Sequence, residues 1–399
     1  MYIPSDKILY NYARILIDFA LGAGKGIKKE QIVYVHYDSP AHPLALQVYR
    51  RILEKGGYPI TKVSHEDFSK VFYTVASEAQ LKFFPAKYMK SLVDTIDHRI
   101  YLLSHDDPLY LKQVDPKKIV MGQTQLQRLR KWIWEKEEKG KLTWTLCLYG
   151  TAGMARQAGL TEAEYWEQIE KACFLKEADP LESWRAVFGQ INKTLKKLNA
   201  LSIDKLHLTA KDTDLWIKLG ADRQFIGGRG ANIPSFEIFT SPDWRGTEGH
   251  IYFDLPLYRY GTIASSIHLT FKKGKIIKVK ASKNEKLIKE LVSQPNADKV
   301  GEYSLTDKRF SKIDKFMANT LFDENFGGDF GNTHLAVGSS YHDAYRGDVK
   351  KMKSKDWGKL GFNESVEHTD MMATHNRTVE VTLINGVKKI IYKDGEFVV

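Results

Sequence analysis

The first half of the chain alternates apolar residues at helical spacing with short, continuously apolar runs. Apolar residues recur every three to four positions over residues 8–20, directly after Pro4-Ser5-Asp6, which predicts a helix with its N-cap in that tripeptide and its end at Gly22. Further helices are predicted at 43–53, 162–176 and 181–198. Short apolar runs predict buried strands at 31–35, 59–63, 99–103 and 143–148. Strands that alternate with helices indicate a parallel α/β sheet.

The pattern changes near residue 200, where short strands separated by Gly, Pro and Asp replace the long helical repeats. We therefore expect an N-terminal doubly wound parallel-sheet domain over residues 1–200 and a C-terminal α+β domain over residues 201–399. A chain of 399 residues also exceeds the size at which one hydrophobic core stops growing. Lysine alternates with Ile and Val over residues 272–280, which predicts a hairpin with one solvent-exposed face.

The charge balance leaves one alternative class of function open. The chain has 60 Lys and Arg against 49 Asp and Glu, a net charge of +11, which would suit a nucleic-acid-binding protein. The densest basic run, 272–280, contains neither arginine nor an aromatic residue on which a base could stack. No apolar run reaches the roughly 20 residues that span a bilayer. We expect partners other than nucleic acid or membrane.

The cysteines limit the compartment and the kind of metal site. Cys147 and Cys173 could form one bridge at most, which excludes a disulfide scaffold and a zinc site of paired CxxC motifs. The N-terminus shows no basic region leading into an apolar one, so a cytoplasmic protein is expected. Any metal would have to be held by His, Asp and Glu.

The glycine-rich run at residues 22–26 resembles a phosphate-binding loop only in composition. Such a loop needs a strand before its glycines and a helix after them, so that the N-terminus of the helix meets the anion. Here a predicted helix precedes the glycines and a strand follows. The run is interpreted as a helix end and a turn.

The segment at residues 367–370 carries the first candidate ligands. On an extended chain, residues two apart face the same side, so His368 and Asp370 would offer an imidazole and a carboxylate together. A hydrogen-bonded pair at the surface is the alternative. Residues 323–338 carry the second group, in which Glu324 and a glycine-rich stretch lead to His334. Tyr341 would reach the same site if the chain turns at residues 338–340, and a glycine loop capped by His334 is the alternative.

Two carboxylates lie in apolar surroundings in the second half. Glu237 is flanked by Phe and Ile, and a buried carboxylate needs a cation or a counter-charge to offset its desolvation. An ion pair with Arg229 or Arg245 is the alternative to a metal. Glu302 lies in a second strand-like run, at residues 300–305.

Taken in order, these segments resemble the M29 metallo-aminopeptidases, the group of aminopeptidases T and S. The resemblance rests on Asn-Ile-Pro-x-x-Glu-Ile-Phe-Thr from residue 232, Gly-Glu at 301, Asp-Glu-Asn at 323, His-Leu-Ala-x-Gly at 334 and His-x-Asp at 368. It covers most of the chain, although the specific motifs lie between residues 232 and 370. It implies that two divalent metals are bound by Glu237, Glu302, His334, His368 and Asp370, with Glu324 as a sixth ligand.

The resemblance also implies a chemistry. A mixed set of imidazoles and carboxylates suits Zn²⁺, Co²⁺ or Mn²⁺, and two such ions activate a water for attack on a peptide carbonyl. Glu302 would bridge the metals or act as base, and Tyr341 would donate a hydrogen bond to the oxyanion. Short peptides would lose single N-terminal residues, and the protein would be a homodimer. A non-catalytic, degenerate member of the same fold is the alternative.

Two departures from the family pattern stand out. Phe236 occupies a position where an acidic or small residue is commoner, and the segment between Glu324 and His334 is lengthened by Gly and Asp residues. The lengthened segment bears most on Glu324, because a longer loop need not return its carboxylate to the metals.

Overall fold

The chain divides into two compact units, which are described one at a time. The computed structural model describes residues 2–220, 222–227, 230–259 and 262–399. Residues 1–183 and 229–234 belong to the first unit, and residues 184–228 and 235–399 to the second. The predicted domains, 1–200 and 201–399, remain a prediction.

A five-stranded parallel sheet forms the centre of the first unit, with strand order β2-β1-β3-β4-β8. Its strands are β1 (Ile32–Asp38), β2 (Tyr58–Ser64), β3 (His98–Leu103), β4 (Thr143–Leu148) and β8 (Asn232–Ile233). Four of them overlap the predicted strands, and the pairing confirms the parallel sheet expected from the alternation of strands and helices.

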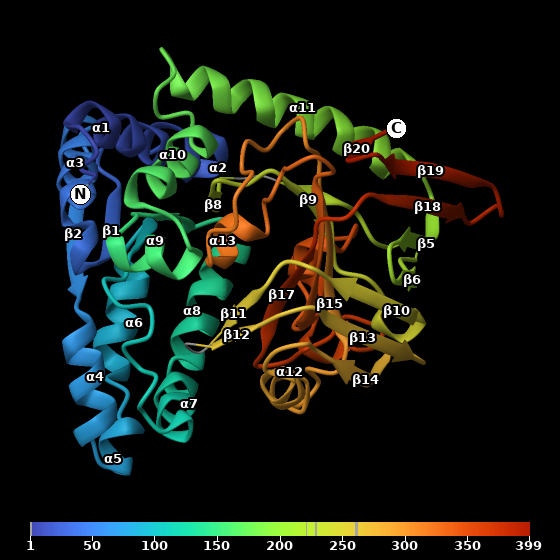
Figure 1. Ribbon diagram of the computed structural model, residues 1–399. Helices are drawn as coiled ribbons and strands as arrows, with labels where there is room; N and C mark the ends of the chain where they lie inside the picture. Colours follow the sequence, from blue (N-terminus) through green and yellow to red (C-terminus); the bar gives the residue numbers. More distant parts are fainter. Residues whose placement is uncertain (1, 221, 228–229, 260–261) are drawn as a thin grey trace. The chain divides into compact units, whose positions relative to one another are not determined.

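Helices connect these strands (Figure 1). They are α1 (Asp6–Ile15), α2 (Leu21–Gly24), α3 (His42–Glu54), α4 (Glu66–Val75), α5 (Glu78–Leu81), α6 (Ala86–Thr95), α7 (Pro116–Gln125), α8 (Gln127–Glu138), α9 (Ala152–Ala158) and α10 (Glu162–Ala172). Tyr34 of β1 packs in one cluster with Val93 of α6 and Ile133 of α8. Val33 and Val35 point to the opposite face and are fully buried. Helices therefore enclose both faces of the sheet.

The glycine-rich run at 22–26 lies where a helix ends. Gly22 and Gly26 have φ angles of +64° and +75°, in the left-handed region that favours glycine. A side chain at Gly26 would come within 2.7 Å of the Asp18 carbonyl oxygen. The run closes the first helical segment before β1, as the sequence predicts.

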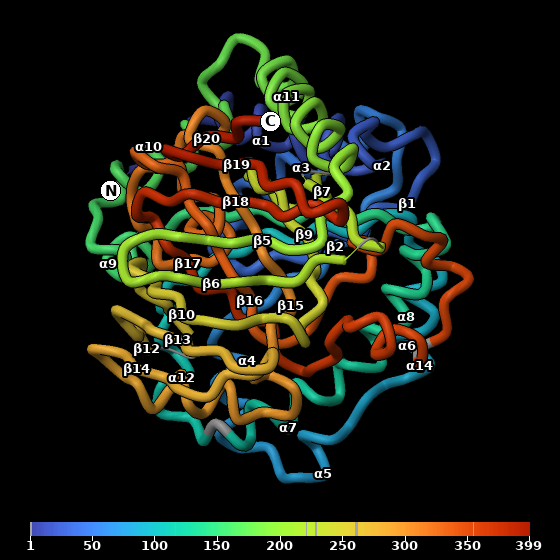
Figure 2. The backbone as a smooth tube through the Cα atoms, turned by 90° about the vertical axis from the view of Figure 1, so that its right-hand side faces the viewer, coloured from blue at the N-terminus to red at the C-terminus, as the bar shows by residue number. Residues whose placement is uncertain are grey.

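The second unit begins within α11 (Pro180–Ala200) and contains an antiparallel sheet of eight strands, ordered β14-β13-β10-β6-β5-β18-β19-β20 (Figure 2). Its strands are β5 (Ile203–Ala210), β6 (Thr213–Lys218), β10 (Glu248–Phe253), β13 (Ile267–Lys272), β14 (Lys275–Lys280), β18 (Arg377–Leu383), β19 (Lys388–Lys393) and β20 (Glu396–Phe397). The lysine-rich run at 272–280 forms the turn and second strand of the β13–β14 hairpin, as predicted.

A second antiparallel sheet in the same unit has five strands, ordered β17-β16-β15-β9-β7. They are β7 (Ile226–Gly227), β9 (Glu237–Thr240), β15 (Val300–Thr306), β16 (Asn332–Gly338) and β17 (His368–Ala373). Smaller elements accompany the two sheets: β11 (Leu257–Arg259), β12 (Thr262–Ala264), α12 (Glu285–Val292), α13 (Thr320–Asp323) and α14 (Ser354–Trp357). The predicted fold class, a parallel α/β part followed by a second part of a different kind, is confirmed.

Neither cysteine takes part in a disulfide, and both Cys147 and Cys173 are buried. In the part of the chain that the structure describes, no helix has both the length and the apolar character that crossing a bilayer requires.

Candidate metal centre

The five-stranded sheet brings the candidate ligands together through its register. Ala336 of β16 lies opposite Glu302 of β15 on one side and opposite Asp370 of β17 on the other. The two carboxylates therefore flank a small residue at the same level of the sheet. His334 is two residues before Ala336, on the same face, and β9 contributes Glu237 at its first position.

The first group of ligand atoms consists of Glu237, Glu302 and His334. His334 Nε2 lies 3.1 Å from Glu302 Oε1 and 3.3 Å from Glu237 Oε2. One ligand atom from each residue falls within 4.8 Å of the others, and all three residues are buried. This spacing fits one cation between two carboxylates and an imidazole.

The second group consists of Glu302, His368 and Asp370, with its atoms also within 4.8 Å of one another. His368 Nε2 lies 3.5 Å from Glu302 Oε2 and 3.5 Å from Asp370 Oδ1. Side chains two positions apart on β17 thus face the same side, as the extended segment predicts. Glu302 belongs to both groups, one oxygen facing each histidine.

Both imidazoles are oriented by backbone carbonyls. His368 Nδ1 lies 2.8 Å from the Ser339 carbonyl oxygen, and His334 Nδ1 lies 3.3 Å from the Glu324 carbonyl oxygen. A carbonyl oxygen only accepts, so Nδ1 is the donor in each ring. The Nε2 lone pair of each neutral histidine is then aimed at the carboxylates, which is the arrangement of metal-binding histidines.

Glu324 is buried beside these groups despite the lengthened segment that follows it. Burial and then the charges of Glu237 and Asp370 raise the pKa of Glu324 well above its ordinary value. Asn332 Nδ2 donates to the Glu324 carbonyl oxygen at 2.9 Å, which ties the far end of the segment back to its start. The added residues form a closed loop, but Glu324 is in neither group of ligand atoms that lie within 4.8 Å of one another, and its place as a sixth ligand stays a prediction.

The pKa values of the other ionisable groups in the cluster are shifted by burial and by one another's charge. Burial lowers the pKa of His334, but hydrogen bonds to Glu237 and Glu302 outweigh it, and the pKa lies well above its ordinary value. The pKa of His368 is raised in the same way by Asp370 and Glu302, against its burial. Burial raises the pKa of Glu237, whereas His368 outweighs burial at Asp370 and lowers its pKa to about 2. In the metal-free centre, protons on the histidines thus take the place of a cation.

Tyr341 reaches the site because the chain turns after β16. Gly338 has a φ of +105°, and a side chain there would come within 2.1 Å of the Glu367 carbonyl oxygen. The Tyr341 ring lies 4.9 Å from the His368 ring, centroid to centroid. Burial, followed by the charges of Glu302 and Asp370, raises the pKa of Tyr341 well above its ordinary value. Its hydroxyl therefore stays protonated as a donor.

Two alternatives to metal binding were an ion pair of Glu237 with Arg229 or Arg245 and a surface pair of His368 with Asp370. Arg245 pairs with Asp243, Nη2 to Oδ2 at 2.7 Å, and Arg229 lies outside the described residues. His368 and Asp370 are not a surface pair, because only 23% and 11% of their side chains is exposed. Among the described residues, the ion-pair partners of Glu237, Glu302 and Asp370 are the two histidines.

Residues that the sequence did not single out support the candidate ligands. Ser304 donates its hydroxyl hydrogen to Glu237 Oε2 at 3.1 Å. It lies two residues after Glu302 on β15, so strand alternation was a signal that could have identified it. Phe236, the departure beside Glu237, is fully buried and stacks on Trp184 at a centroid distance of 5.3 Å. An acidic residue would lose that packing, which accounts for the Phe.

The chemistry of the donors fits divalent cations. Oxygen and imidazole donors suit divalent cations, and structural thiolate sites have a different composition. Three carboxylates converge on two imidazole nitrogens, and among the described residues no lysine or arginine forms an ion pair with Glu237, Glu302 or Asp370. Such burial is costly unless a cation compensates it.

Comparison with known proteins agrees with this geometry. The family model described as thermophilic metalloprotease (M29) matches residues 5–397. Aminopeptidase AmpS of Bacillus subtilis (strain 168) is 28% identical over 98% of both chains. Aminopeptidase T of Thermus thermophilus is 28% identical over 74% of this chain and 76% of that relative. The solved structure of wild-type AmpT from Thermus thermophilus superposes with a TM-score of 0.85 at 24% identity, covering 98% of this chain and 99% of the other. The chain therefore belongs to the M29 family of metalloproteases, and the metallo-aminopeptidase class expected from its sequence is confirmed at the level of the family.

Proposed function

We propose that the protein releases single N-terminal residues from short peptides at a centre that binds two divalent cations. The observation that carries this proposal is the shared carboxylate: Glu302 offers one oxygen to the group around His334 and the other to the group around His368. A carboxylate that bridges two cations presents its oxygens in this way.

The charge of the cluster supports two cations rather than one. Glu237, Glu302, Glu324 and Asp370 carry four negative charges when ionised, and both imidazoles are neutral when they bind a metal. Two divalent cations would balance that charge within a buried site. We assign Glu237 and His334 to one cation, His368 and Asp370 to the other, Glu302 to both, and Glu324 as a sixth ligand.

Two residues are proposed to act on the substrate. Bound divalent cations would supply the Lewis acidity that polarises a peptide carbonyl and activates a water. Glu302 belongs to both ligand groups, where it either bridges the two cations or accepts the proton of the attacking water. Tyr341, with its protonated hydroxyl, donates a hydrogen bond to the oxyanion that develops on the carbonyl oxygen. A free α-amine on the substrate would be bound by the same acidic cluster, which explains a preference for peptide N-termini.

We also propose the metal, the substrate class, the oligomeric state and the compartment. The cations are Zn²⁺, Co²⁺ or Mn²⁺, on the basis of the mixed oxygen and nitrogen donors. Short peptides are the substrates, two copies of the chain form a homodimer, and the protein acts in the cytoplasm. The two cysteines, neither of which forms a disulfide, are consistent with a reducing compartment.

The test compares an aminoacyl anilide with its N-acetylated form, before and after removal of metal by a chelator. We expect hydrolysis of the free-amine substrate only, loss of activity on chelation, and recovery when Co²⁺, Zn²⁺ or Mn²⁺ is added. If no cation restores hydrolysis, the alternative of a degenerate, non-catalytic family member is favoured. Equal hydrolysis of the acetylated substrate would contradict the proposed use of a free N-terminus.

A further inference from the structure

Tyr341 is held by its backbone as well as by ring contacts with Phe239 of β9 and His368 of β17, at centroid distances of 5.7 and 4.9 Å. It follows the end of β16. Its N–H donates to Ser241 Oγ at 2.8 Å. Ser241 is fully buried and directly follows β9, the strand that begins with Glu237. One hydroxyl therefore connects the backbone of Tyr341 to the strand of a candidate ligand.

Ser241 is itself fixed by a buried arginine. Arg223 Nε donates to the Ser241 carbonyl oxygen at 2.7 Å, and Nη2 donates to the Leu360 carbonyl oxygen at 2.6 Å. Nη1 forms an ion pair with Asp222 Oδ2 at 3.0 Å, and the guanidinium lies 3.7 Å from the centre of the Phe362 ring. None of the Arg223 side chain is exposed. A buried charge is costly, so its three polar contacts must be kept together.

The same segment anchors the residues that follow Tyr341. Gln224 donates its backbone N–H to the Ala344 carbonyl oxygen at 2.9 Å and its side-chain amide to the Asp343 and Tyr345 carbonyl oxygens, at 3.0 and 3.1 Å. The N–H of Arg346 donates to the Asp222 carbonyl oxygen at 2.9 Å. Residues 222–224 and Ser241 therefore hold residues 341–346 along their length.

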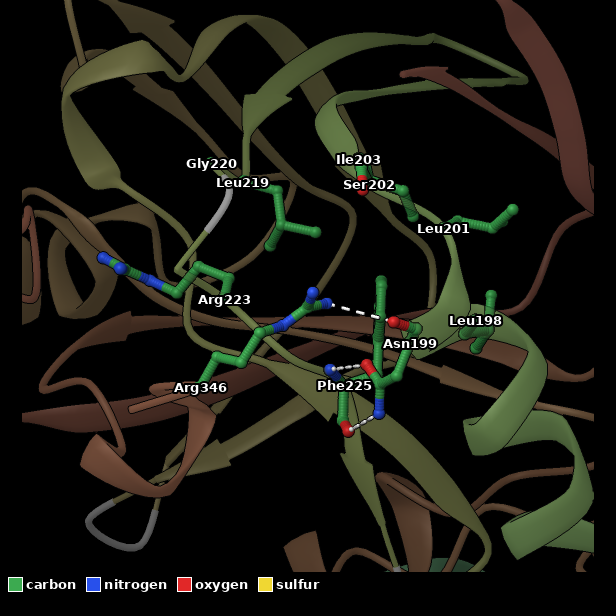
Figure 3. Close-up of a pocket in the computed structure, with 10 residues that line it drawn as sticks. All are labelled: Leu198, Asn199, Leu201, Ser202, Ile203, Leu219, Gly220, Arg223, Phe225 and Arg346. Carbon is green, nitrogen blue, oxygen red and sulfur yellow. Dashed lines mark hydrogen bonds between the residues drawn. The ribbon is translucent and has the colours of Figure 1, made fainter. Parts of the chain in front are cut away.

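The nearby cavity does not explain Arg223 as a ligand-binding residue. Arg223 and Arg346 both line it, but Figure 3 shows the Arg223 side chain pointing away from its centre, and Arg346 bonded to the Asn199 carbonyl oxygen. Its internal volume is about 10 Å³, room for about one water molecule. A peptide or an organic anion would not fit.

We infer that Ser241, itself held by Arg223, is a positioning residue that sets the Tyr341 hydroxyl over the metal centre. This inference rests on the oxyanion role proposed for Tyr341. An oxyanion donor works only within a narrow range of distance and direction, and a displacement of about 1 Å costs up to about 10²-fold in rate. The Ser241 hydroxyl accepts the N–H of Tyr341 itself and so helps to fix the backbone from which the Tyr341 side chain extends.

The experiment is a double-mutant cycle of Ser241→Ala and Tyr341→Phe, measured as kcat and KM on an aminoacyl anilide. We expect Tyr341→Phe to lower kcat by about 10²-fold and Ser241→Ala by about 10-fold, with KM nearly unchanged. In the Tyr341→Phe background, Ser241→Ala should have no further effect on kcat, because the hydroxyl that it positions is gone. Arg223→Lys, which cannot keep all three contacts, should show the same dependence; the Ser241→Ala cycle decides the matter if that variant does not fold.

Thr213→Val is the matched control. Thr213 Oγ1 accepts the backbone N–H of Tyr252 at 3.0 Å in the eight-stranded sheet, so the variant loses a similar bond away from the site. It should lower the thermal midpoint about as much as Ser241→Ala while leaving kcat unchanged. Independent, multiplicative effects of Ser241→Ala and Tyr341→Phe would overturn the positioning role. A wild-type kcat in Tyr341→Phe alone would instead refute the role proposed for Tyr341.

Discussion

The two antiparallel sheets of the second unit differ in which residues along their strands are buried. In the eight-stranded sheet, Leu206 and Leu208 of β5 are buried while His207 between them is partly exposed, the usual alternation of a sheet with one solvated face. In the five-stranded sheet, every residue of β15 and β16 is buried, including Glu302 and His334. The first sheet buries mainly apolar residues, with Arg377 of β18 as a buried cation, whereas the second buries carboxylates and histidines.

The difference between the sheets indicates which buried residues contribute to folding and which do not. Alternation is what a sheet needs to fold, and a buried carboxylate opposes folding unless something compensates it. One histidine–aspartate pair in each sheet illustrates the difference. His207 Nε2 lies 2.8 Å from Asp214 Oδ1 with the Asp side chain 59% exposed, whereas the His368–Asp370 pair is largely buried. Chemically similar pairs thus have different roles, because one faces water and the other faces further carboxylates.

The largest effect should come from His368→Ala in the five-stranded sheet, with His207→Ala in the eight-stranded sheet as its control. His368→Ala removes a candidate ligand, and a lost Lewis-acid contribution of several kcal/mol corresponds to at least about 10³-fold in kcat/KM. His207→Ala should change kcat/KM by less than about twofold, because His207 lies in the eight-stranded sheet and belongs to neither group of ligand atoms. Circular dichroism checks that both variants are folded. Comparable losses in the two variants would break the contrast between the sheets.

The second prediction concerns Glu324→Gln in the metal-free protein. Because burial and neighbouring charges disfavour an ionised Glu324, the amide should raise the free energy of unfolding by on the order of 1 kcal/mol. With metal present, the variant should lose part of its activity if Glu324 is a ligand. Urea unfolding after chelation, together with kcat, measures both effects.

Glu380→Gln is its control in the other sheet. Glu380 Oε1 pairs with Lys388 Nζ at 2.9 Å at the surface, so its loss should lower stability by less than about 1 kcal/mol, with or without metal. Destabilisation of the metal-free protein by Glu324→Gln would show that the carboxylate is compensated without a cation.

The smallest predicted effect is a pH dependence near the five-stranded sheet. Burial lowers the pKa of His342, which stacks on Trp357 at a centroid distance of 3.9 Å, to about 4. The unfolded chain takes up this proton near pH 6.5, so the stability from His342 is complete above that pH and is lost as the pH falls towards 4. Thermal midpoints of the wild type and His342→Phe between pH 4 and 7 test this. Parallel curves would refute it.

The parallel sheet and the β13–β14 hairpin were predictable because their apolar residues follow a simple period. Residues His368 and Asp370 could be predicted to face the same side from the geometry of a strand alone. That Glu302 would lie between two histidines could not, since it depends on the antiparallel register of three strands that are distant in sequence. The family resemblance supplied the order of the motifs. The roles of Ser241 and Arg223 depend on backbone hydrogen bonds between loops, which leave no periodic signal.

The most direct test of the account is the number of cations bound per chain. Metal analysis and calorimetric titration of the metal-free protein should give two divalent cations for the wild type. Glu237→Ala and Asp370→Ala, each in a different ligand group, should each weaken one cation and leave the other. A single cation in the wild type, or none, would contradict a centre in which Glu302 joins two metal sites.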